Sequence, residues 1–586
     1  MEPEEYFKAQ EIVNKRRYDA LRDFFAGKRS AQEVACQHGY TVSSLYSLAR
    51  DFRSHLQSGS GDDFFFKDIH SGRKEIKDGD LKDLIISLRK LNFSTEDILA
   101  IAHSKNYSIS YGYVYRLLKD EGFARLPRRS SEEKKHLELP AMKAPISITL
   151  QVVDEKFHAA GSGLFAFLPV IRSYGIDKAI ASSGYPSTKG ISRLSSILSF
   201  IALKLSSVKR YSKDDLWCMD RGLGLFAGLN VLPKAAWLSS YSSRVTTEMN
   251  TSFLKQLHRI WIANGLLSDT VNLDFTTIPY WGEVDHLEHS WSGKRGRALS
   301  SMLSVLAQDP DSGIIDYGGC NVLHKKESAV VLEYLDFYKQ TPSGNQTLEY
   351  LVFDSKFTNY ENLSKLDEQQ IKFITIRRRG EKILEQISKN THYRAVRVEA
   401  CGMKKRSLKV RDEIASLAGY CDSKTGKSKS VRQIIIAGHG KSKPALIITN
   451  DFEMPLKKVV RKYCRRWLVE KGIAEQIDFF HLNRVSSSMV IKVDFDLIMT
   501  LLAHNIYRLF ASKLERYGHL CDEKIYEKFI ANNGDITIDT NDDFINIELK
   551  KKRDLPLILD LMKIFEHIQY PWLKNKKIKF LPAASS

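Results

Sequence analysis

Apolar and polar residues in the N-terminal fifth of the sequence follow the period of an α-helix, and the same arrangement occurs twice. In the first copy, residues 30–39 and 43–50 are two short amphipathic stretches, and Gly39 suits the turn between them. In the second copy, helices are expected over 80–91, 94–102 and 111–119. Each copy has the spacing of a helix-turn-helix, and a plain helical hairpin is the alternative.

In a helix-turn-helix, the second short helix carries the exposed residues that face DNA. The candidate DNA-binding residues are Ser43, Ser44, Tyr46 and Arg50 in the first copy and Tyr111, Tyr113 and Arg116 in the second. The two modules are expected over 1–57 and 81–125, with linkers over 58–80 and 126–145. Residues 146–265 continue a helical pattern, which we interpret as a helical DNA-binding domain; within it, 233–244 fits either a DNA-facing helix or a core helix.

After residue 266 the pattern changes to strands that alternate with helices. Strands are expected over 270–278, 299–307, 314–322, 348–354 and 372–377, and helices over 327–339 and 361–370. Three antiparallel strands followed by helix, strand, helix and strand is the order of an RNase H-like domain. The sequence therefore predicts a multidomain chain in which all-α modules precede an α/β domain whose first part spans 266–376.

Residues 377–446 are predicted to be a basic, β-rich insertion in this α/β domain. Between 377 and 432 the sequence has 16 Lys and Arg against 6 Asp and Glu, on strands expected to be short and irregular. We expect this insertion to contact DNA phosphates, in particular through Arg377, Arg378 and Arg379. The domain is expected to resume over 447–515 with two long helices, and 516–586 to be a C-terminal domain with a β-hairpin over 536–549.

Overall charge points to the same class of partner. The 586 residues include 89 Lys and Arg against 70 Asp and Glu, a formal net charge of +19, which favours double-stranded DNA as the partner. The 7 cysteines are widely spaced without a Cys-x2-Cys pair, which argues against a disulfide framework or a structural zinc site. No apolar stretch reaches the length of a membrane span, and the N-terminus has no apolar segment of a secretory signal, so we expect a cytoplasmic protein without a membrane partner.

Three acidic residues lie where an RNase H-like domain places metal ligands. Asp274 lies in the first strand, and Asp354 ends the fourth, which pairs beside the first in this topology. The third acid is expected on the helix over 455–481, where Glu470 and Glu475 are the candidates. Such a carboxylate cluster holds two Mg²⁺ ions about 4 Å apart during phosphodiester cleavage or joining, and Mn²⁺ is expected to substitute.

The helix over 455–481 also carries a recognisable motif. Tyr463-x2-Arg466-x3-Glu470 resembles the opening of the signature of a large group of bacterial insertion-sequence DDE transposases, which have an RNase H-like catalytic domain with a β-rich insertion. Residues 351–357 and 273–277 resemble the motifs around the group's other two acids. The resemblance spans roughly 270–512, and it departs from the signature at Ile477, where the group has a lysine.

The resemblance implies that Asp274, Asp354 and Glu470 are catalytic metal ligands and that Tyr463 and Arg466 hold DNA near the scissile phosphate. Positions 463, 466 and 470 share one helical face, whereas position 475 is turned about 140° away from 470. A surface salt bridge between Glu470 and Arg466 is the alternative explanation for this spacing.

The function that the resemblance implies is DNA transposition. The protein would bind the terminal inverted repeats of a mobile element, cleave DNA at its ends and join the 3′-hydroxyls to target DNA. We expect a homodimer or larger assembly on DNA, in the bacterial cytoplasm at the nucleoid. The alternatives are a non-catalytic DNA-binding relative, domesticated or regulatory, and an RNase H-like metal nuclease that cuts without joining.

Overall fold

The computed structural model divides the chain into two compact units, residues 1–80 and 81–586. It describes residues 12–27, 29–57, 64–65, 79–90, 93, 95–105, 107–123, 148–188, 190–208, 216–280, 287–292, 297–320, 322–340, 348–390, 392–398, 406–439, 443–482, 489–550 and 552–583. Between 467 and 477, the backbone alone is described. The linker predicted over 126–145 and most of the one over 58–80 lie outside the described residues.

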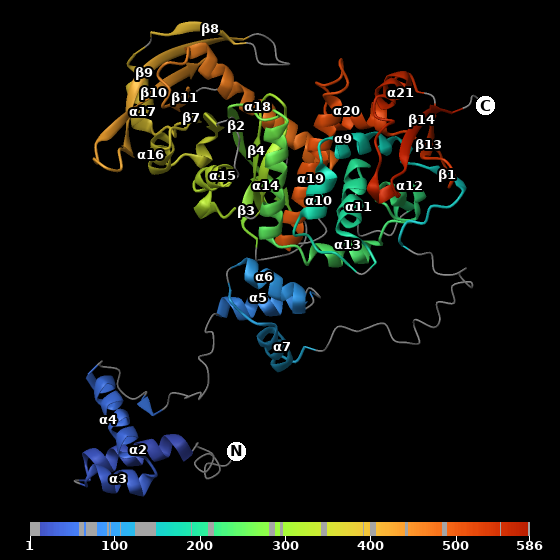
Figure 1. Cartoon of the computed structure of the whole chain (residues 1–586). Helices are drawn as coiled ribbons and strands as arrows, with labels where there is room; N and C mark the ends of the chain where they lie inside the picture. The colour runs from blue at the N-terminus through green and yellow to red at the C-terminus, as the bar shows by residue number, and fades with distance from the viewer. Residues whose placement is uncertain are drawn as a thin grey trace. The chain divides into compact units, whose positions relative to one another are not determined.

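In the described part of the first unit, the helices are α2 (Ile12–Phe25), α3 (Ala31–His38) and α4 (Val42–Gln57) (Figure 1). Helix α3 begins at a capping box, in which Ser30 and Glu33 each accept a backbone hydrogen bond from the other. It ends at Gly39, whose φ of +67° favours glycine and turns the chain into α4. Small and aliphatic side chains fill the core between the helices: Ala20, Val34, Ala35 and Leu45.

The second unit begins with a similar group of three helices, α5 (Gly79–Lys90), α6 (Thr95–Ser104) and α7 (Tyr111–Asp120). The side chain of Ser110 caps α7 by accepting a hydrogen bond from the Tyr113 backbone. Leu81, Ile85, Ile98, Val114 and Leu118 are among the buried residues of its core. The three-helix arrangement agrees with the expected element order in both places, and the helix-turn-helix role of each stays a prediction.

A ten-stranded mixed sheet forms the centre of the second unit (Figure 1). Its order is β3 (His289–Ser292), β4 (Arg297–Gln308), β2 (Thr270–Pro279), β6 (Tyr350–Phe353), β7 (Lys372–Ile376), β11 (Ala445–Thr449), β10 (Ser428–Ala437), β9 (Arg406–Cys421) and β8 (Arg394–Val398), and β5 (Ile315–Gly319) also pairs with β4. The β2–β6 and β6–β7 pairs are parallel, and the other pairs are antiparallel.

Helices cover both faces of this sheet. Helix α18 (Leu456–Phe479) packs against β2, β6 and β7, and one apolar cluster joins its Val460 and Tyr463 to the sheet. The other face belongs to the main core, with α15 (Val330–Lys339) and α16 (Tyr360–Glu368) in it. The buried helix α19 (Val490–Ala511) packs against β5 and against helices from the 146–265 segment.

The inserted segment differs from its expected structure. Short, irregular strands were the wrong prediction, because β9 spans 16 residues and β10 spans 10, and both continue the central sheet beyond β11. The segment also contains a helix that was not expected, α17 (Glu381–Ser388). The reason is that Leu408 and Val410 are buried while Ser407 and Lys409 are exposed, a strand pattern of period two that the high charge of the segment conceals.

The segments expected to be separate helical and C-terminal domains share a second sheet. Its order is β1 (Glu155–Ala159), β12 (Gly534–Ile538), β13 (Phe544–Leu549) and β14 (Lys577–Pro582). The helices before and after it are α9 (Leu168–Ser173), α10 (Ile176–Ser182), α11 (Arg193–Leu205), α12 (Arg221–Phe226), α13 (Ala235–Ser242), α14 (Thr247–Ala263), α20 (Asp522–Ile525) and α21 (Leu555–Lys563). The domain boundaries stay a prediction. In the described part of the chain, no helix combines the length and apolar character that crossing a membrane requires.

Candidate active site

Strand β2 carries the first candidate acid. The stretch from Thr270 to Ile278 is rich in β-branched residues, which favours an extended strand, and it lies between two other strands of the sheet. Asp274 is 7% exposed and lies on the face of β2 that packs against α18. A carboxylate at such a buried position needs a compensating partner or a functional reason.

The second candidate acid ends the neighbouring strand. Leu273 on β2 pairs in parallel register with Phe353 on β6, so Asp274 and Asp354 are the next residues of the two strands. Adjacent strands lie about 4.8 Å apart, and residues in register point to the same face. The parallel pairing therefore brings Asp274 and Asp354 together at the carboxyl end of β6.

Hydroxyl and aromatic contacts fix the chain around Asp354. Its backbone carbonyl accepts hydrogen bonds from the hydroxyls of Thr358 at 3.5 Å and Thr375 at 3.4 Å. The rings of Phe275 and Phe357 stack at 3.9 Å, which ties the residue after Asp274 to the turn after Asp354. The Asp354 side chain is half-buried and forms no ion pair with any described residue.

Helix α18 places Arg466 directly on the first acid. Arg466 Nη1 lies 3.3 Å from Asp274 Oδ2, and the two side chains are only 3% and 9% exposed. The guanidinium lies 5.4 Å from the centre of the Tyr463 ring, which is itself 4% exposed in the apolar cluster under the sheet. Tyr463 and Arg466 of the sequence motif are therefore both buried, and Arg466 contacts the first acid.

Lys462 is a residue of this face that the sequence analysis missed. It forms a salt bridge with Asp269 at 3.4 Å, donates a hydrogen bond to Thr270, and lies 4.1 Å from the ring of Tyr350. Its only signal in the sequence is the spacing of four residues before Arg466. Lys462 and Arg466 together fix α18 alongside β2.

Glu470 lies in α18 one turn beyond Arg466, and its side chain is outside the described residues. The helical backbone places position 470 on the side that carries Tyr463 and Arg466, and it turns position 475 away. Among the side chains that the structure describes, no three His, Cys, Asp or Glu residues form a group that could hold a metal. Glu470 as the third ligand stays a prediction, as does the replacement of the signature lysine by Ile477.

The donor set on this face fits a hard divalent cation. Mg²⁺ prefers oxygen ligands, and Asp274 and Asp354 offer two carboxylates from neighbouring strands. Asn272 lies two residues before Asp274, fully buried, and neither atom of its amide has a hydrogen-bond partner among the described residues. The side-chain oxygen of Asn272 on this face is therefore available to a water or another ligand.

Comparison with known proteins agrees with this geometry. A protein-family model described as "Transposase DDE domain" matches residues 271–506, a span that contains β2, β6 and α18. We refer to residues 271–506, which this model matches, as the DDE domain. No curated protein matches the sequence.

Solved structures with some similarity to the chain are also transposases. A piggyBac transposase synaptic complex with hairpin DNA is 9% identical, over 64% of this chain and 82% of that one, with a TM-score of 0.34. The pre-cleavage Mos1 transpososome is 12% identical, over 62% and 78%, and the Mos1 strand transfer complex is 12% identical, over 62% and 77%, each with a TM-score of 0.13. At these TM-scores, the likeness carries no argument, and the assignment of the DDE domain depends on the family match.

The three arginines at the start of the insertion in the DDE domain differ in exposure. Arg377 is half-buried and donates a hydrogen bond to the side chain of Gln433 at 2.7 Å. Arg379 is exposed and donates to the backbone carbonyls of Lys443 and Pro444. Arg378 is exposed, and no described residue forms an ion pair with it, so it is the arginine best placed to meet a phosphate.

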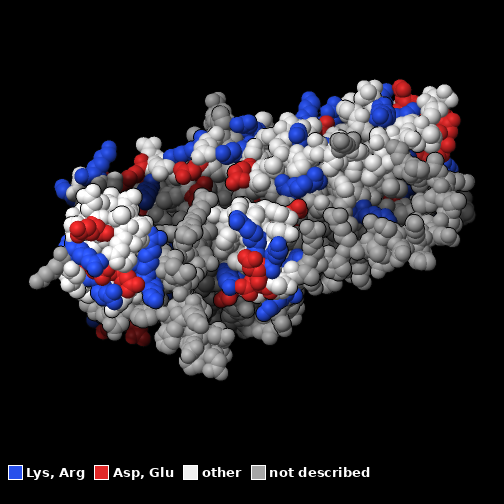
Figure 2. Space-filling view, turned by 90° about the horizontal axis from the view of Figure 1, so that it is seen from below, with Lys and Arg blue, Asp and Glu red and all other residues white. Residues whose placement is uncertain are grey.

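The candidate DNA-facing residues outside the DDE domain are largely exposed. On α4 these are Ser43, Ser44, Tyr46 and Arg50, all exposed. On α7, Tyr111 and Arg116 are exposed, whereas Tyr113 is half-buried against the core of its three helices. Figure 2 shows a face on which Lys and Arg are interspersed with Asp and Glu, so the excess charge does not form one continuous patch there.

Proposed function

We propose that the chain is a metal-dependent DNA transposase whose chemistry is centred on Asp274, Asp354 and Glu470. The observation that carries this proposal is the parallel pairing of β2 with β6, which brings two acids of the DDE domain together. The strand order β5, β4, β2, β6, β7 supports an RNase H-like catalytic core, because it is the order that the element sequence predicts.

The roles of the residues follow from their positions. Asp274 and Asp354 would hold one side of a two-cation site, and Glu470 would complete it from α18. When bound, two Mg²⁺ or Mn²⁺ ions supply charge neutralisation at the attacking and leaving oxygens. Asp274 is held in a fixed rotamer by Arg466 and by the hydrogen bond from the Phe275 backbone at 2.8 Å, so its carboxylate is positioned before DNA arrives.

Cleavage and joining are both in-line displacements at phosphorus. The protein therefore has no need of a nucleophilic side chain or a covalent intermediate with DNA, and its residues mainly position phosphate and cations. The exposed helices α4 and α7 would recognise the terminal inverted repeats through the major groove. Two element ends must be handled together, which supports a homodimer or larger assembly, and a nucleoid-associated cytoplasmic location follows from this substrate.

The test uses purified full-length protein and labelled duplexes that carry the DNA flanking its gene, with Mg²⁺ or Mn²⁺. Wild type is compared with Glu470→Gln, and Glu475→Gln serves as the matched control on the same helix. Cleavage at the end followed by joining to a plasmid, lost in Glu470→Gln and kept in the control, would support the proposal. Binding without cleavage in wild type would favour a non-catalytic relative, and cleavage without joining would favour a nuclease.

A further inference from the structure

The candidate metal ligand Asp274 is already neutralised by a cation of the protein itself. The Arg466 guanidinium lies 3.3 Å from Oδ2, and both groups are almost completely buried. A divalent ion on Oδ2 would compete with this guanidinium for the same oxygen and would repel its charge. Asp354, by contrast, has no ion pair with any described residue, so the competition is confined to Asp274.

We propose that Arg466 pairs with Asp274 until DNA phosphate binds and then leaves it, so that binding of the metal to Asp274 depends on DNA. This inference rests on the proposed function. Separating a buried guanidinium from a carboxylate that it contacts is strongly unfavourable unless each group gains a new partner. If phosphate takes the guanidinium while a divalent cation takes the carboxylate, neither charge is left unpaired.

The chemistry of the side chain suits this exchange. A guanidinium binds the oxygens of phosphate with the same planar geometry that it uses for carboxylates. The ring of Tyr463, 5.4 Å away, provides a face along which the guanidinium can remain while it changes its anion. Since Arg466 is anchored in α18, its movement would be a rotation of the side chain rather than of the helix.

The experiment measures Mn²⁺ binding to the full chain by electron paramagnetic resonance, with and without a duplex that carries the flanking ends. In wild type, DNA is expected to raise Mn²⁺ affinity by about tenfold or more, and Arg466→Gln is expected to bind Mn²⁺ about tenfold more tightly without DNA. The matched control is Arg465→Gln, the exposed neighbour that pairs with Asp311 at 2.6 Å, and it should behave as wild type.

The inference would be overturned if DNA did not change the Mn²⁺ affinity of wild type. It would also be overturned if Arg466→Gln did not bind Mn²⁺ more tightly than wild type without DNA. If Arg466→Gln does not fold, Arg466→Lys gives the same test, because the shorter cation should hold Asp274 less firmly. Asp354→Asn distinguishes failure of the proposed metal site from failure of the proposed exchange at Asp274. Mn²⁺ binding that Asp354→Asn leaves intact would overturn the proposed metal site itself, whereas binding that depends on Asp354 but not on Arg466 would overturn only the exchange.

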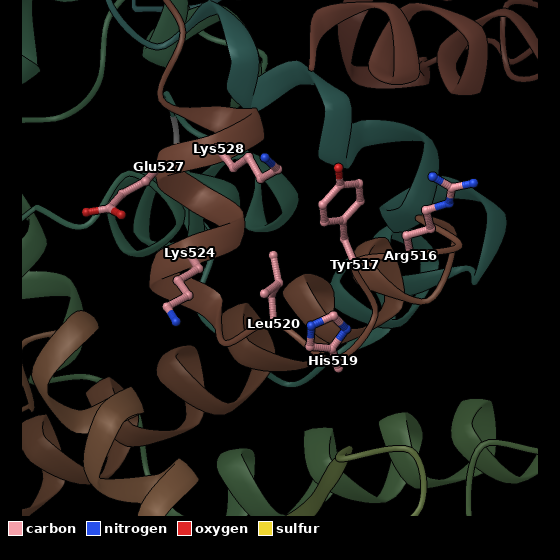
Figure 3. A pocket seen from close by; sticks show the side chains of 7 residues that line it. All are labelled: Arg516, Tyr517, His519, Leu520, Lys524, Glu527 and Lys528. Atoms are coloured by element: carbon pink, nitrogen blue, oxygen red, sulfur yellow. The ribbon is translucent and has the colours of Figure 1, made fainter. Parts of the chain in front are cut away.

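A second inference concerns a pocket after α19, which we call the basic pocket. It has a volume of about 490 Å³ and is lined by Arg516, Tyr517, His519, Leu520, Lys524, Glu527 and Lys528 (Figure 3). Arg516, His519 and Lys524 are exposed, and none of the three forms an ion pair with a described residue. In Figure 3, Glu527 points away from Tyr517, whereas Lys528 points toward the Tyr517 ring, with its Nζ 5.0 Å from the ring centre.

The basic pocket is held in shape by buried and half-buried contacts. Arg508 of α19 donates hydrogen bonds to the backbone carbonyls of Gly518 and Leu520. The ring of Tyr517 packs edge-on against Phe529 at 5.1 Å. Phe529 belongs to a π-helix over Tyr526–Ile530, a kind of segment that occurs frequently at functional sites.

We infer that the basic pocket binds the phosphate backbone of DNA that enters the proposed active site, an inference that also rests on the proposed function. Phe479 near the end of α18 packs 5.6 Å from Tyr526, which connects the pocket to the helix of Glu470.

Binding of a duplex without metal, measured over a range of salt concentrations, tests this site. Arg516→Gln with Lys524→Gln should reduce the slope of log affinity against log salt by about two. The control pair Lys563→Gln with Lys579→Gln removes the same charge from α21 and β14. An unchanged slope, or an equal loss in the control pair, would overturn the inference. Calorimetry with inorganic phosphate is the second measurement. If phosphate binds but the variant leaves the salt slope of DNA affinity unchanged, the pocket binds a small ligand and the inference is also overturned.

Discussion

Removing either partner of the Asp274–Arg466 pair should destabilise the DDE domain, whereas removing Asp354 should not. Asp274→Asn leaves a guanidinium that is 3% exposed without its carboxylate, and Arg466→Gln leaves a carboxylate that is 9% exposed without its cation. Breaking a buried ion pair from one side costs about 3–5 kcal/mol. Asp354→Asn changes a half-buried side chain without an ion pair to any described residue, so the expected cost is within about 0.5 kcal/mol.

The double variant gives the sharper measurement. With both charges removed, neither partner is left uncompensated, so Asp274→Asn with Arg466→Gln should cost less than the sum of the single changes. For residues in contact, the expected interaction free energy is about 2–3 kcal/mol. Hydrogen exchange of amides in β2 and α18, followed by mass spectrometry without metal or DNA, reports the free energy of local opening in the full chain.

The result bears on how activity data are interpreted. Asp274→Asn and Asp354→Asn are both expected to abolish cleavage, but only the first should also accelerate exchange in β2. Lost DNA binding in Asp274→Asn would then report local unfolding, and the same loss in Asp354→Asn would report a role in binding. The reasoning would be refuted if Asp274→Asn cost no more than Asp354→Asn, or if the double variant cost the full sum.

Three further predictions follow from individual contacts. Ser30→Ala should increase amide exchange in α3 by an amount equivalent to about 1 kcal/mol. Hydrogen bonding from the Ser30 backbone lowers the pKa of Glu33, so the stability of this cap should be present above pH ~4.3 and lost as the pH falls through the lowered pKa. Amide exchange measured at several pH values would show this loss. Gly534→Ala should weaken the β12–β13 pair by about 1–3 kcal/mol, measured as exchange in β13, since a Cβ there would lie 1.9 Å from a backbone oxygen of that strand. Arg378→Gln should reduce the salt dependence of DNA affinity by about one, whereas Arg377→Gln, whose guanidinium already has a protein partner, should reduce it less; equal effects would contradict this assignment.

Local sequence pattern was sufficient for the elements that hold the acids. The strand expected over 270–278 is β2 at Thr270–Pro279, and the helix expected over 455–481 is α18 at Leu456–Phe479. Both consist of residues with strong intrinsic preferences between clear breaks in the pattern, so little long-range information was required. The pairing of β2 with β6 followed from the predicted strand order, whereas the register that pairs Leu273 with Phe353 was not predicted.

Contacts between distant segments were beyond the reach of the same reasoning. Strand β1 pairs with β12, about 380 residues later in the chain, and nothing in either segment indicates its partner. The long strand β9 was missed because it lies in a highly charged segment whose pattern was interpreted as irregular. In each case, tertiary pairing determines the structure, and a local pattern specifies only which residues can be extended.

The burial of polar groups on one face of β2 links the structure to its function more closely than the motif does. Well-packed apolar residues in place of a buried ion pair are often neutral or more stable, so stability alone gives no reason to keep Asp274 and Arg466. Asn272, fully buried with an amide that has no hydrogen-bond partner among the described residues, adds a further cost on the same face. Such costs are expected where chemistry requires carboxylates in fixed positions. Because these buried polar groups lie under α18 and beside Asp354, this face is where the catalytic ligands of the DDE domain should be sought.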